Sequence, residues 1–247
     1  MEICKPDKIY NQKFFVYGHR GVPFLQKENT LKSFETAIDL GFDGVELDIM
    51  STKDGKIIVN HDTLLKSSSS AEEYKISNIN YENINNFPLL KDTLISIGHM
   101  TIVNIEIKDQ GKTSYTVVDK LIKILKELSL IDNIIISSFN PDIIREVKKT
   151  DDRFPTAWIW EEENLKFYNL YYVVLKYYKP DAIHIYHRIA SKKLVKKIHK
   201  KGMKAIAYTV NDKEKLEKLI RKNIDGVFTD NPKILEEVNQ KIHQKIL

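Results

Sequence analysis

Short apolar runs with the length and composition of β-strands recur along the whole chain, separated by polar or helix-type sequence. Eight such runs lie at Phe14–Gly18, Gly44–Ile49, Thr101–Ile107, Asn133–Ser137, Thr156–Trp160, Ala182–Tyr186, Ala205–Val210 and Gly226–Thr229. Between several of them, apolar residues spaced three and four apart predict amphipathic helices, two of which end before Gly41 and Gly202. Eight strand–helix units within 247 residues predict an α/β fold, the (β/α)8 or TIM barrel.

The same alternation would also suit an open, doubly wound parallel sheet, which is the alternative architecture. One segment, residues 63–86, fits no strand–helix unit because it is mostly polar and rich in Asn. We expect it to form a short loop insertion after the second βα unit, either as a flap facing substrate or as a passive excursion. No linker rich in Pro or Gly divides the chain, so residues 1–247 are expected to form a single domain.

Charge and composition exclude several classes of function. The formal net charge is +5, which is too small to indicate nucleic-acid binding. No stretch approaches about 18 consecutive apolar residues, so no membrane-spanning segment is expected. The lone Cys4 cannot form an intramolecular disulfide, and the first thirty residues lack the pattern of a secretory signal. These features predict a cytoplasmic protein, and they leave its oligomeric state open.

Carboxylates occupy alternate positions in two of the predicted strands. In Val45–Ile49, the period of two places the apolar side chains on one face and Glu46 and Asp48 on the other. The apolar face must pack against the helices, so Glu46 and Asp48 are expected to point into the barrel. Glu106 of the next long strand follows the same pattern. Three carboxylates are therefore predicted to meet inside the barrel.

Like charges at such close range repel each other unless a proton or a cation lies between them. Oxygen ligands alone, without His or Cys, suit a hard divalent cation, so Glu46, Asp48 and Glu106 predict a site for Mg²⁺ or Ca²⁺. The alternative is a metal-free ion network in which Glu46 or Asp48 pairs with Lys108 or Arg20.

Two histidines directly follow strand-type runs. His19 and Arg20 follow the first run, while His61 follows the short apolar run Ile57–Val59 and precedes Asp62. Two imidazoles beside a cation and a guanidinium suit phosphodiester cleavage, because one can remove a proton and the other can protonate the leaving oxygen. The other histidines are expected to serve packing or to lie at the surface: His99, His184, His187, His199 and His243.

These residues belong to an ordered set of motifs that resembles the glycerophosphodiester phosphodiesterase family. The motifs are His19–Gly21, Glu28–Thr30, Glu46–Asp48, His61–Asp62, Asn104–Lys108, Ser137–Phe139, Tyr208–Asn211 and Asp225–Pro232. Each motif alone is weak, but their order and spacing over nearly the whole chain are specific.

The resemblance implies a barrel enzyme that hydrolyses a small-molecule glycerophosphodiester to glycerol 3-phosphate and an alcohol. It implies that Glu46, Asp48 and Glu106 hold the divalent cation and that His19 and His61 are the acid/base pair. Two further roles are implied for basic residues, with Arg20 and Lys108 contacting the phosphate. Tyr208 stands where the family usually has Trp and is expected to line the substrate pocket.

Two other interpretations of function remain open at this level. One is a lysophospholipase D-type phosphodiesterase, which would need an apolar entrance to its pocket. The other is a catalytically idle barrel that binds phosphodiesters.

Two motifs receive purely structural interpretations. Asp230 or Asn231, just before Pro232, is expected to cap a helix. The lysine-rich segment Lys192–Lys201 has apolar residues at helical spacing, which predicts the solvated face of an outer helix.

Overall fold

The computed structural model describes Ile9 and residues 14–66, 72–163 and 177–243, so Cys4 and residues 67–71 of the predicted insertion lie outside it. Parallel strands pair in the order β1-β11-β10-β9-β8-β7-β6-β2, and a further pairing of β1 with β2 closes the ring. Their bounds are β1 (Phe15–Gly18), β2 (Gly44–Ser51), β6 (Ile102–Ile107), β7 (Ile134–Ser138), β8 (Thr156–Trp160), β9 (Ala182–Tyr186), β10 (Lys204–Tyr208) and β11 (Gly226–Thr229). The closed ring confirms the predicted barrel and excludes the open sheet.

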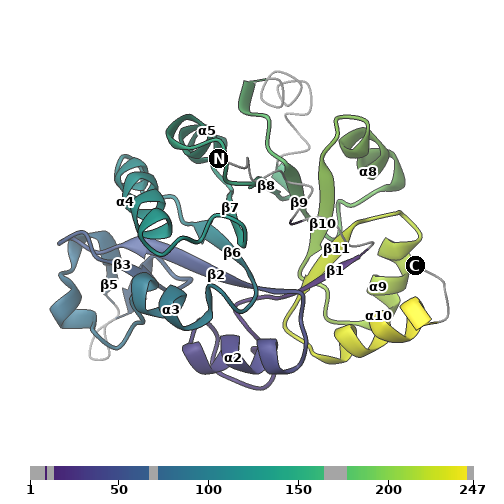
Figure 1. Cartoon of the computed structure of the whole chain (residues 1–247), viewed down its shortest axis with the longest axis horizontal. Helices are drawn as coiled ribbons and strands as arrows, with labels where there is room; N and C mark the ends of the chain where they lie inside the picture. Colours follow the sequence, from purple (N-terminus) through teal and green to yellow (C-terminus); the bar gives the residue numbers. More distant parts are fainter. Residues whose placement is uncertain (1–8, 10–13, 67–71, 164–176, 244–247) are drawn as a thin grey trace.

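Helices surround the ring of strands in Figure 1. Their bounds are α2 (Leu31–Asp39), α3 (Leu90–Ile97), α4 (Thr113–Glu127), α5 (Pro141–Thr150), α8 (Lys192–His199), α9 (Lys213–Ile220) and α10 (Lys233–His243). Several begin at a polar side chain that accepts a hydrogen bond from the first turn: Thr30, Asn140, Ser191 and Asp212. These caps explain why α2, α5, α8 and α9 begin where they do.

The segment predicted as a loop insertion contains short elements. After β3 (Ile57–Val59), which pairs antiparallel with β2, the chain forms β4 (Leu64–Lys66) and β5 (Glu73–Lys75), an antiparallel pair. Two 3-10 turns follow, η1 (Ile76–Asn78) and η2 (Tyr81–Ile84). Ile76 and Ile84 pack with Met50 and Ile58 in a small apolar cluster of their own. These two side chains fasten the segment beside β2 and β3, before α3 begins.

The alternation of side chains along the strands produces two apolar layers. Outward-facing residues of β2, such as Val45, Leu47 and Ile49, are fully buried in the large core between strands and helices. Inward-facing residues form a smaller cluster inside the ring, with Phe15, Tyr17, Ile135, Ala157, Ala182, Ile206 and Phe228. Phe15, Ile135, Ala157 and Ala182 lie in the first half of their strands, whereas the polar Glu106 lies near the C-terminal end of β6.

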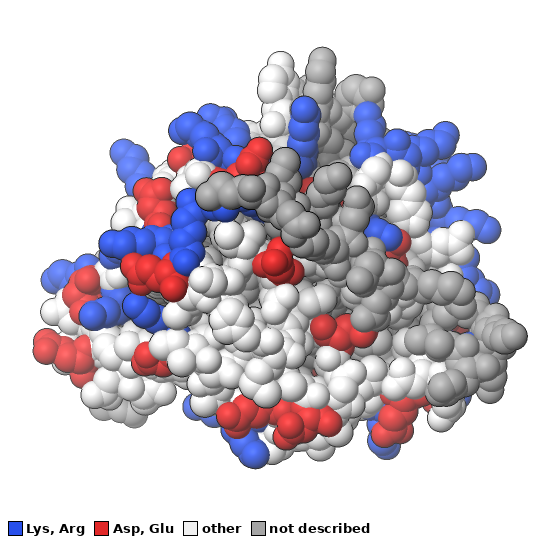
Figure 2. Space-filling view, viewed as in Figure 1, with Lys and Arg blue, Asp and Glu red and all other residues white. Residues whose placement is uncertain are grey.

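Lysines of the segment Lys192–Lys201 are exposed on α8 and just after it, while Leu194, Val195 and Ile198 are buried. Figure 2 shows Lys and Arg side chains gathered on this side of the molecule. The pattern is that of the predicted solvated helix face. Within the described residues, no helix combines the length and apolar character needed to cross a membrane.

Candidate active site

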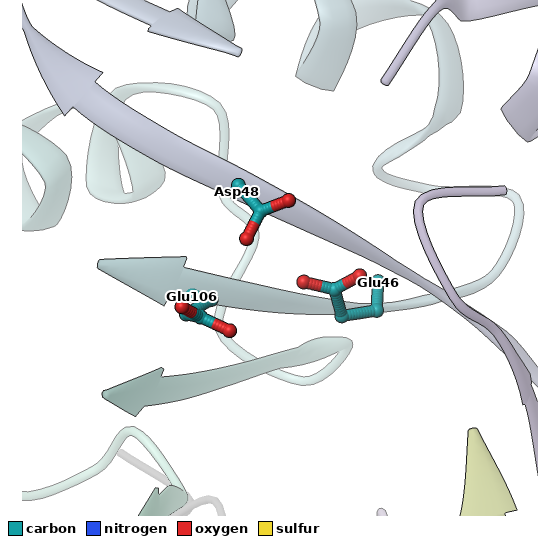
Figure 3. Close-up of side chains that lie close together, drawn as sticks. All are labelled: Glu46, Asp48 and Glu106. Atoms are coloured by element: carbon teal, nitrogen blue, oxygen red, sulfur yellow. The ribbon is translucent and has the colours of Figure 1, made fainter. Parts of the chain in front are cut away.

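The three predicted carboxylates meet inside the barrel. Glu46 and Asp48 extend from β2, and Glu106 extends from the neighbouring β6, where it lies opposite Asp48 in the register (Figure 3). One oxygen from each carboxylate lies within 4.8 Å of the other two, and all three residues are buried. The arrangement brings together one oxygen from each of three side chains at a distance that a single cation can bridge.

Basic side chains face this cluster. Lys108 Nζ lies 2.8 Å from Asp48 Oδ1 and 2.6 Å from Glu106 Oε1, and Arg20 Nε lies 3.4 Å from Asp48 Oδ2. Asn29 Nδ2 donates to Asp48 Oδ2 at 2.8 Å. Although burial opposes it, Lys108 and Arg20 together lower the pKa of Asp48 below its usual value. Asp48 is thus a carboxylate that the protein itself stabilises in its charged form.

Glu46 is in a different situation. Its Oε2 accepts a hydrogen bond from the backbone N–H of Arg20 at 2.8 Å, while its Oε1 is buried and has no hydrogen-bond partner among the described residues. Burial, reinforced by the charges of Asp48 and Glu106, raises the pKa of Glu46 well above its usual value. Two basic side chains face three carboxylates, so ionising all three would leave an excess of negative charge. An orphaned buried oxygen within an all-oxygen set fits a hard divalent cation.

The loop after β1 is shaped to bring Arg20 to this cluster. Arg20 itself has φ of 53°, in the left-handed region that non-glycine residues rarely adopt, and Gly21 follows with φ of 88°. A Cβ on Gly21 would lie 2.2 Å from Ser33 Oγ of α2, so only glycine fits. Glu28 Oε1 accepts from Arg20 Nη1 at 3.0 Å. The strained backbone and this ion pair hold the guanidinium beside the carboxylates.

His19 is held by Asp230, one of the two residues predicted as candidates for a helix cap. Asp230 Oδ1 lies 2.7 Å from His19 Nδ1, and Asp230 Oδ2 accepts from Asn211 Nδ2 at 2.6 Å. Although burial opposes it, the hydrogen bond from His19 lowers the pKa of Asp230. The capping role belongs to Asn231, whose Oδ1 accepts from the backbone N–H of Lys233 at 3.1 Å. Asp230 and His19 are far apart in sequence, so only closure of β1 against β11 brings them together.

His61 has a comparable but more exposed partner. Its Nδ1 lies 2.8 Å from Asp62 Oδ1. The backbone N–H of Asn60 donates to the Asp48 carbonyl at 3.0 Å, which places the start of this loop beside the carboxylate strand. In both histidines Nδ1 is engaged by a carboxylate, so Nε2 is the nitrogen left for a substrate.

One cavity, of about 200 Å³, connects these groups. It is lined by His19, Arg20, Glu46, His61, Asn104, Glu106, Lys108, Phe139, Ile159, His184, Tyr208, Thr209 and Phe228. Tyr208 lines the cavity, and because its hydroxyl donates to the Trp160 carbonyl at 3.0 Å, its ring is the part that can contact a ligand. His184, predicted to serve packing or the surface, is buried and lines this cavity.

Comparisons with known proteins agree on one family. Residues 19–234 match the Glycerophosphoryl diester phosphodiesterase family. A glycerophosphodiester phosphodiesterase of Caldanaerobacter subterraneus subsp. tengcongensis is 30% identical over 245 residues, covering 93% of this chain and 99% of that protein.

Solved structures show the same relationship. The glycerophosphodiester phosphodiesterase of Thermotoga maritima has a TM-score of 0.77 at 30% identity, covering 92% of this chain and 99% of that one. An Oleispira antarctica phosphodiesterase, solved in complex with the product sn-glycerol-3-phosphate, shares the fold with a TM-score of 0.81 at 22% identity, covering 94% and 99%. The chain therefore belongs to the glycerophosphoryl diester phosphodiesterase family and is an enzyme of the phosphoric diester hydrolase class.

Proposed function

We propose that this enzyme hydrolyses small glycerophosphodiesters to glycerol 3-phosphate and an alcohol with the help of a divalent cation. The observation that carries the proposal is that one cavity is lined by His19, His61, Arg20 and carboxylates of the acidic cluster. The product complex of the Oleispira antarctica relative supports glycerol 3-phosphate as the product here. We further propose that residues 1–247 act as one catalytic domain.

The carboxylate cluster would hold the cation through Glu46, Asp48 and Glu106. When bound, a divalent cation supplies positive charge that stabilises developing negative charge on phosphate oxygens and lowers the pKa of a ligated hydroxyl. Asp48 and Glu106 also accept hydrogen bonds from Lys108, so the protein orients two of the three carboxylates, and it keeps Asp48 charged, before any ligand arrives.

His19 and His61 are assigned to proton transfer at their Nε2 atoms. One accepts the proton of the glycerol 2-hydroxyl as that hydroxyl attacks phosphorus, and the other donates a proton to the oxygen of the departing alcohol. Water then opens the resulting cyclic phosphate to give glycerol 3-phosphate. Asp230 and Asp62 accept from the Nδ1–H groups, which fixes the tautomer that leaves Nε2 free to act as a base. Each carboxylate also stabilises its imidazole once the ring has gained a proton.

Arg20 and Lys108 are assigned to the phosphate. Arg20 presents a planar fork that can donate to two phosphate oxygens at once, and Glu28 holds that fork in place. Lys108 Nζ faces Asp48 and Glu106 in this structure. If a divalent cation neutralised those carboxylates, charge balance would favour a contact between Lys108 Nζ and the phosphate.

An assay for released glycerol 3-phosphate over a panel of diesters, with and without chelator, tests the proposal. We expect turnover of glycerophosphodiesters with water-soluble head groups, loss of turnover after exhaustive chelation, and recovery with Mg²⁺ or Ca²⁺. Full turnover after chelation would exclude the cation site, and absence of turnover with every diester in the presence of either cation would favour an idle phosphodiester-binding barrel.

A second candidate substrate class is favoured by apolar side chains near the cavity. Phe139 lines it and is 37% exposed. Phe24 and Leu25 are 60% and 53% exposed on the loop after β1, and the Phe24 backbone N–H donates to the Asp230 carbonyl at 3.3 Å. Exposed apolar side chains of this kind suit the acyl chain of a lysophospholipid. Including a lysophospholipid in the panel distinguishes the two classes. A higher kcat/KM for the lysophospholipid than for the water-soluble diesters would make it the preferred substrate.

A further inference from the structure

Two buried polar side chains that line the cavity have hydrogen-bonding atoms without a partner among the described residues. His184 is 2% exposed and Asn104 is 1% exposed. The atoms in question are His184 Nε2 and Asn104 Oδ1. Buried polar atoms in folded proteins are nearly always satisfied, because each unsatisfied one destabilises the fold. Both side chains line the cavity, so a molecule within it is the expected partner.

The surroundings of His184 define what its imidazole can offer. It extends from β9 between Ile159 and Ile206, which are its register neighbours on β8 and β10. Its ring packs edgewise on Phe228, with 4.7 Å between centroids and 62° between planes. Burial lowers the pKa of His184 to about 3, so the imidazole is neutral near pH 7. A neutral ring in an apolar setting can exchange a hydrogen bond with a neutral polar group but offers no charge to an anion.

Asn104 offers an acceptor. Its Nδ2 donates to Ser137 Oγ at 3.0 Å, which identifies Oδ1 as the atom left free. Asn104 precedes Glu106 by two residues on β6 and lies opposite Glu46 in the register. A group bound by Asn104 would therefore lie next to the carboxylate cluster, on the side toward the beginning of the strand. Together, Asn104 and His184 call for a neutral ligand group that both donates and accepts.

We propose that His184 and Asn104 form a hydroxyl-recognition subsite that receives the free primary hydroxyl of the substrate's glycerol moiety. This inference rests on the proposed function and specifies which part of the substrate enters deepest. A hydroxyl has one donor hydrogen and two acceptor lone pairs, so it can donate to Asn104 Oδ1 and accept from a His184 Nε2–H. Ile159 and Phe228, which also line the cavity, supply apolar surface for the glycerol carbons.

A binding comparison on the wild-type enzyme tests the subsite without any substitution. The probes are sn-glycerol 3-phosphate and its deoxy analogue, propane-1,2-diol phosphate, which keeps the phosphate and the adjacent hydroxyl but lacks the primary one. Calorimetric titration in one Mg²⁺ buffer should show sn-glycerol 3-phosphate binding about 10–100-fold more tightly, because the analogue leaves buried polar atoms unpaired. Equal affinities would mean that these atoms bind water instead, and would overturn the proposal.

Two variants then assign the preference to its residues. His184→Leu and Asn104→Leu should each reduce the ratio of the two affinities severalfold or more, mainly by weakening binding of sn-glycerol 3-phosphate. The matched control is His99→Leu, since His99 is exposed and bonds the Leu128 carbonyl at 3.1 Å away from the cavity, and it should keep the wild-type ratio. An unchanged ratio in both folded cavity variants would overturn the assignment. If either variant fails to fold, the wild-type comparison alone decides.

The outcomes separate this subsite from the proposed reaction. Turnover of glycerophosphodiesters without a preference between the probes would refute the subsite alone. A clear preference without turnover of any glycerophosphodiester would refute the reaction and retain the subsite. Binding of neither probe would refute the subsite together with glycerol 3-phosphate as a product.

Discussion

The two ends of the barrel interior are built from the same strands and have opposite physical character. Deep in the barrel, Phe15 stacks on Tyr17 and Tyr17 stacks on Phe228, with 6.0 Å and 5.0 Å between the ring centroids, and Phe228 is where this apolar stack meets the cavity. Toward the other end, Glu46 and Glu106 have pKa values that burial raises. The stacked rings stabilise the fold by leaving water, whereas the carboxylates are costly to bury unless something binds them. The difference separates a part made for stability from a part made for a ligand.

The largest effect should come from the proton-transfer groups at the charged end. His19→Ala and His61→Ala should each lower kcat/KM by about 10²–10⁴-fold, while the free energy of unfolding changes little because neither side chain belongs to an apolar core. The double variant should lose much less than the product of the single losses if both groups act in one transition state. Steady-state kinetics and urea unfolding of the three variants check this. Fully multiplicative losses would indicate that the two histidines act in separate steps.

At the apolar end, the expected effect falls on stability instead. Phe15→Ala removes a fully buried ring and should lower the free energy of unfolding by about 3–5 kcal/mol. Its kcat/KM should stay close to wild type at temperatures where the variant is folded. The matched control is Phe24→Ala, since Phe24 is 60% exposed and its loss should change stability by less than about 0.5 kcal/mol. A loss of activity in folded Phe15→Ala would contradict the division between the two ends.

Sequence patterns predicted the apolar and charged parts of the barrel only where local periodicity decides which way a side chain points. All eight barrel strands follow from their apolar runs, and the alternation in β2 correctly sends Glu46 and Asp48 inward. The alternative ion network named Lys108 and Arg20 as partners of Asp48, and the structure contains both pairs. Local patterns could not choose between a phosphate and a carboxylate as the contact of Lys108, because that choice depends on side-chain conformation. The roles of these residues in catalysis stay predictions.

Contacts across the closure of the barrel were beyond the reach of sequence patterns. Asp230 precedes Asn231-Pro232 in a motif typical of a helix start, so helix capping was enough to explain the presence of Asp230 at this position. Its hydrogen bond to His19 depends on β11 lying beside β1. His184 was assigned to packing or the surface for a similar reason, since the cavity it lines is formed by strands distant in sequence. The short strands β4 and β5 were missed because three-residue pairs give no measurable period.

His184 stands between the two ends, and it should make the fold sensitive to acid. Its pKa is about 3 in the folded protein and about 6.5 in the unfolded chain. Above pH 6.5 both states are neutral and the histidine has no effect. Between pH 6.5 and 3 only the unfolded chain gains the proton, so stability falls by up to about 1.4 kcal/mol per pH unit. Urea unfolding at pH 7, 6, 5 and 4 should show a steeper loss for wild type than for His184→Leu. Parallel curves would mean that the folded protein takes up this proton readily.

The smallest expected effect is on the stability of protein from which a chelator has removed all cations. It distinguishes two carboxylates of the charged end, Glu46 and Asp48. Glu46→Gln should raise the free energy of unfolding by about 1 kcal/mol, because an amide that never ionises replaces a buried carboxyl that is costly to ionise there and whose Oε1 has no partner among the described residues. The new amide N–H groups can also donate to the neighbouring carboxylates. Asp48→Asn should instead lower stability, since Lys108 and Arg20 would lose a charged partner. Urea unfolding with and without Mg²⁺ measures both, and the two variants should both reduce the stabilisation that Mg²⁺ gives to wild type. Destabilisation by Glu46→Gln in the chelated protein would show that Glu46 belongs to a self-sufficient ion network rather than to a site that needs a cation.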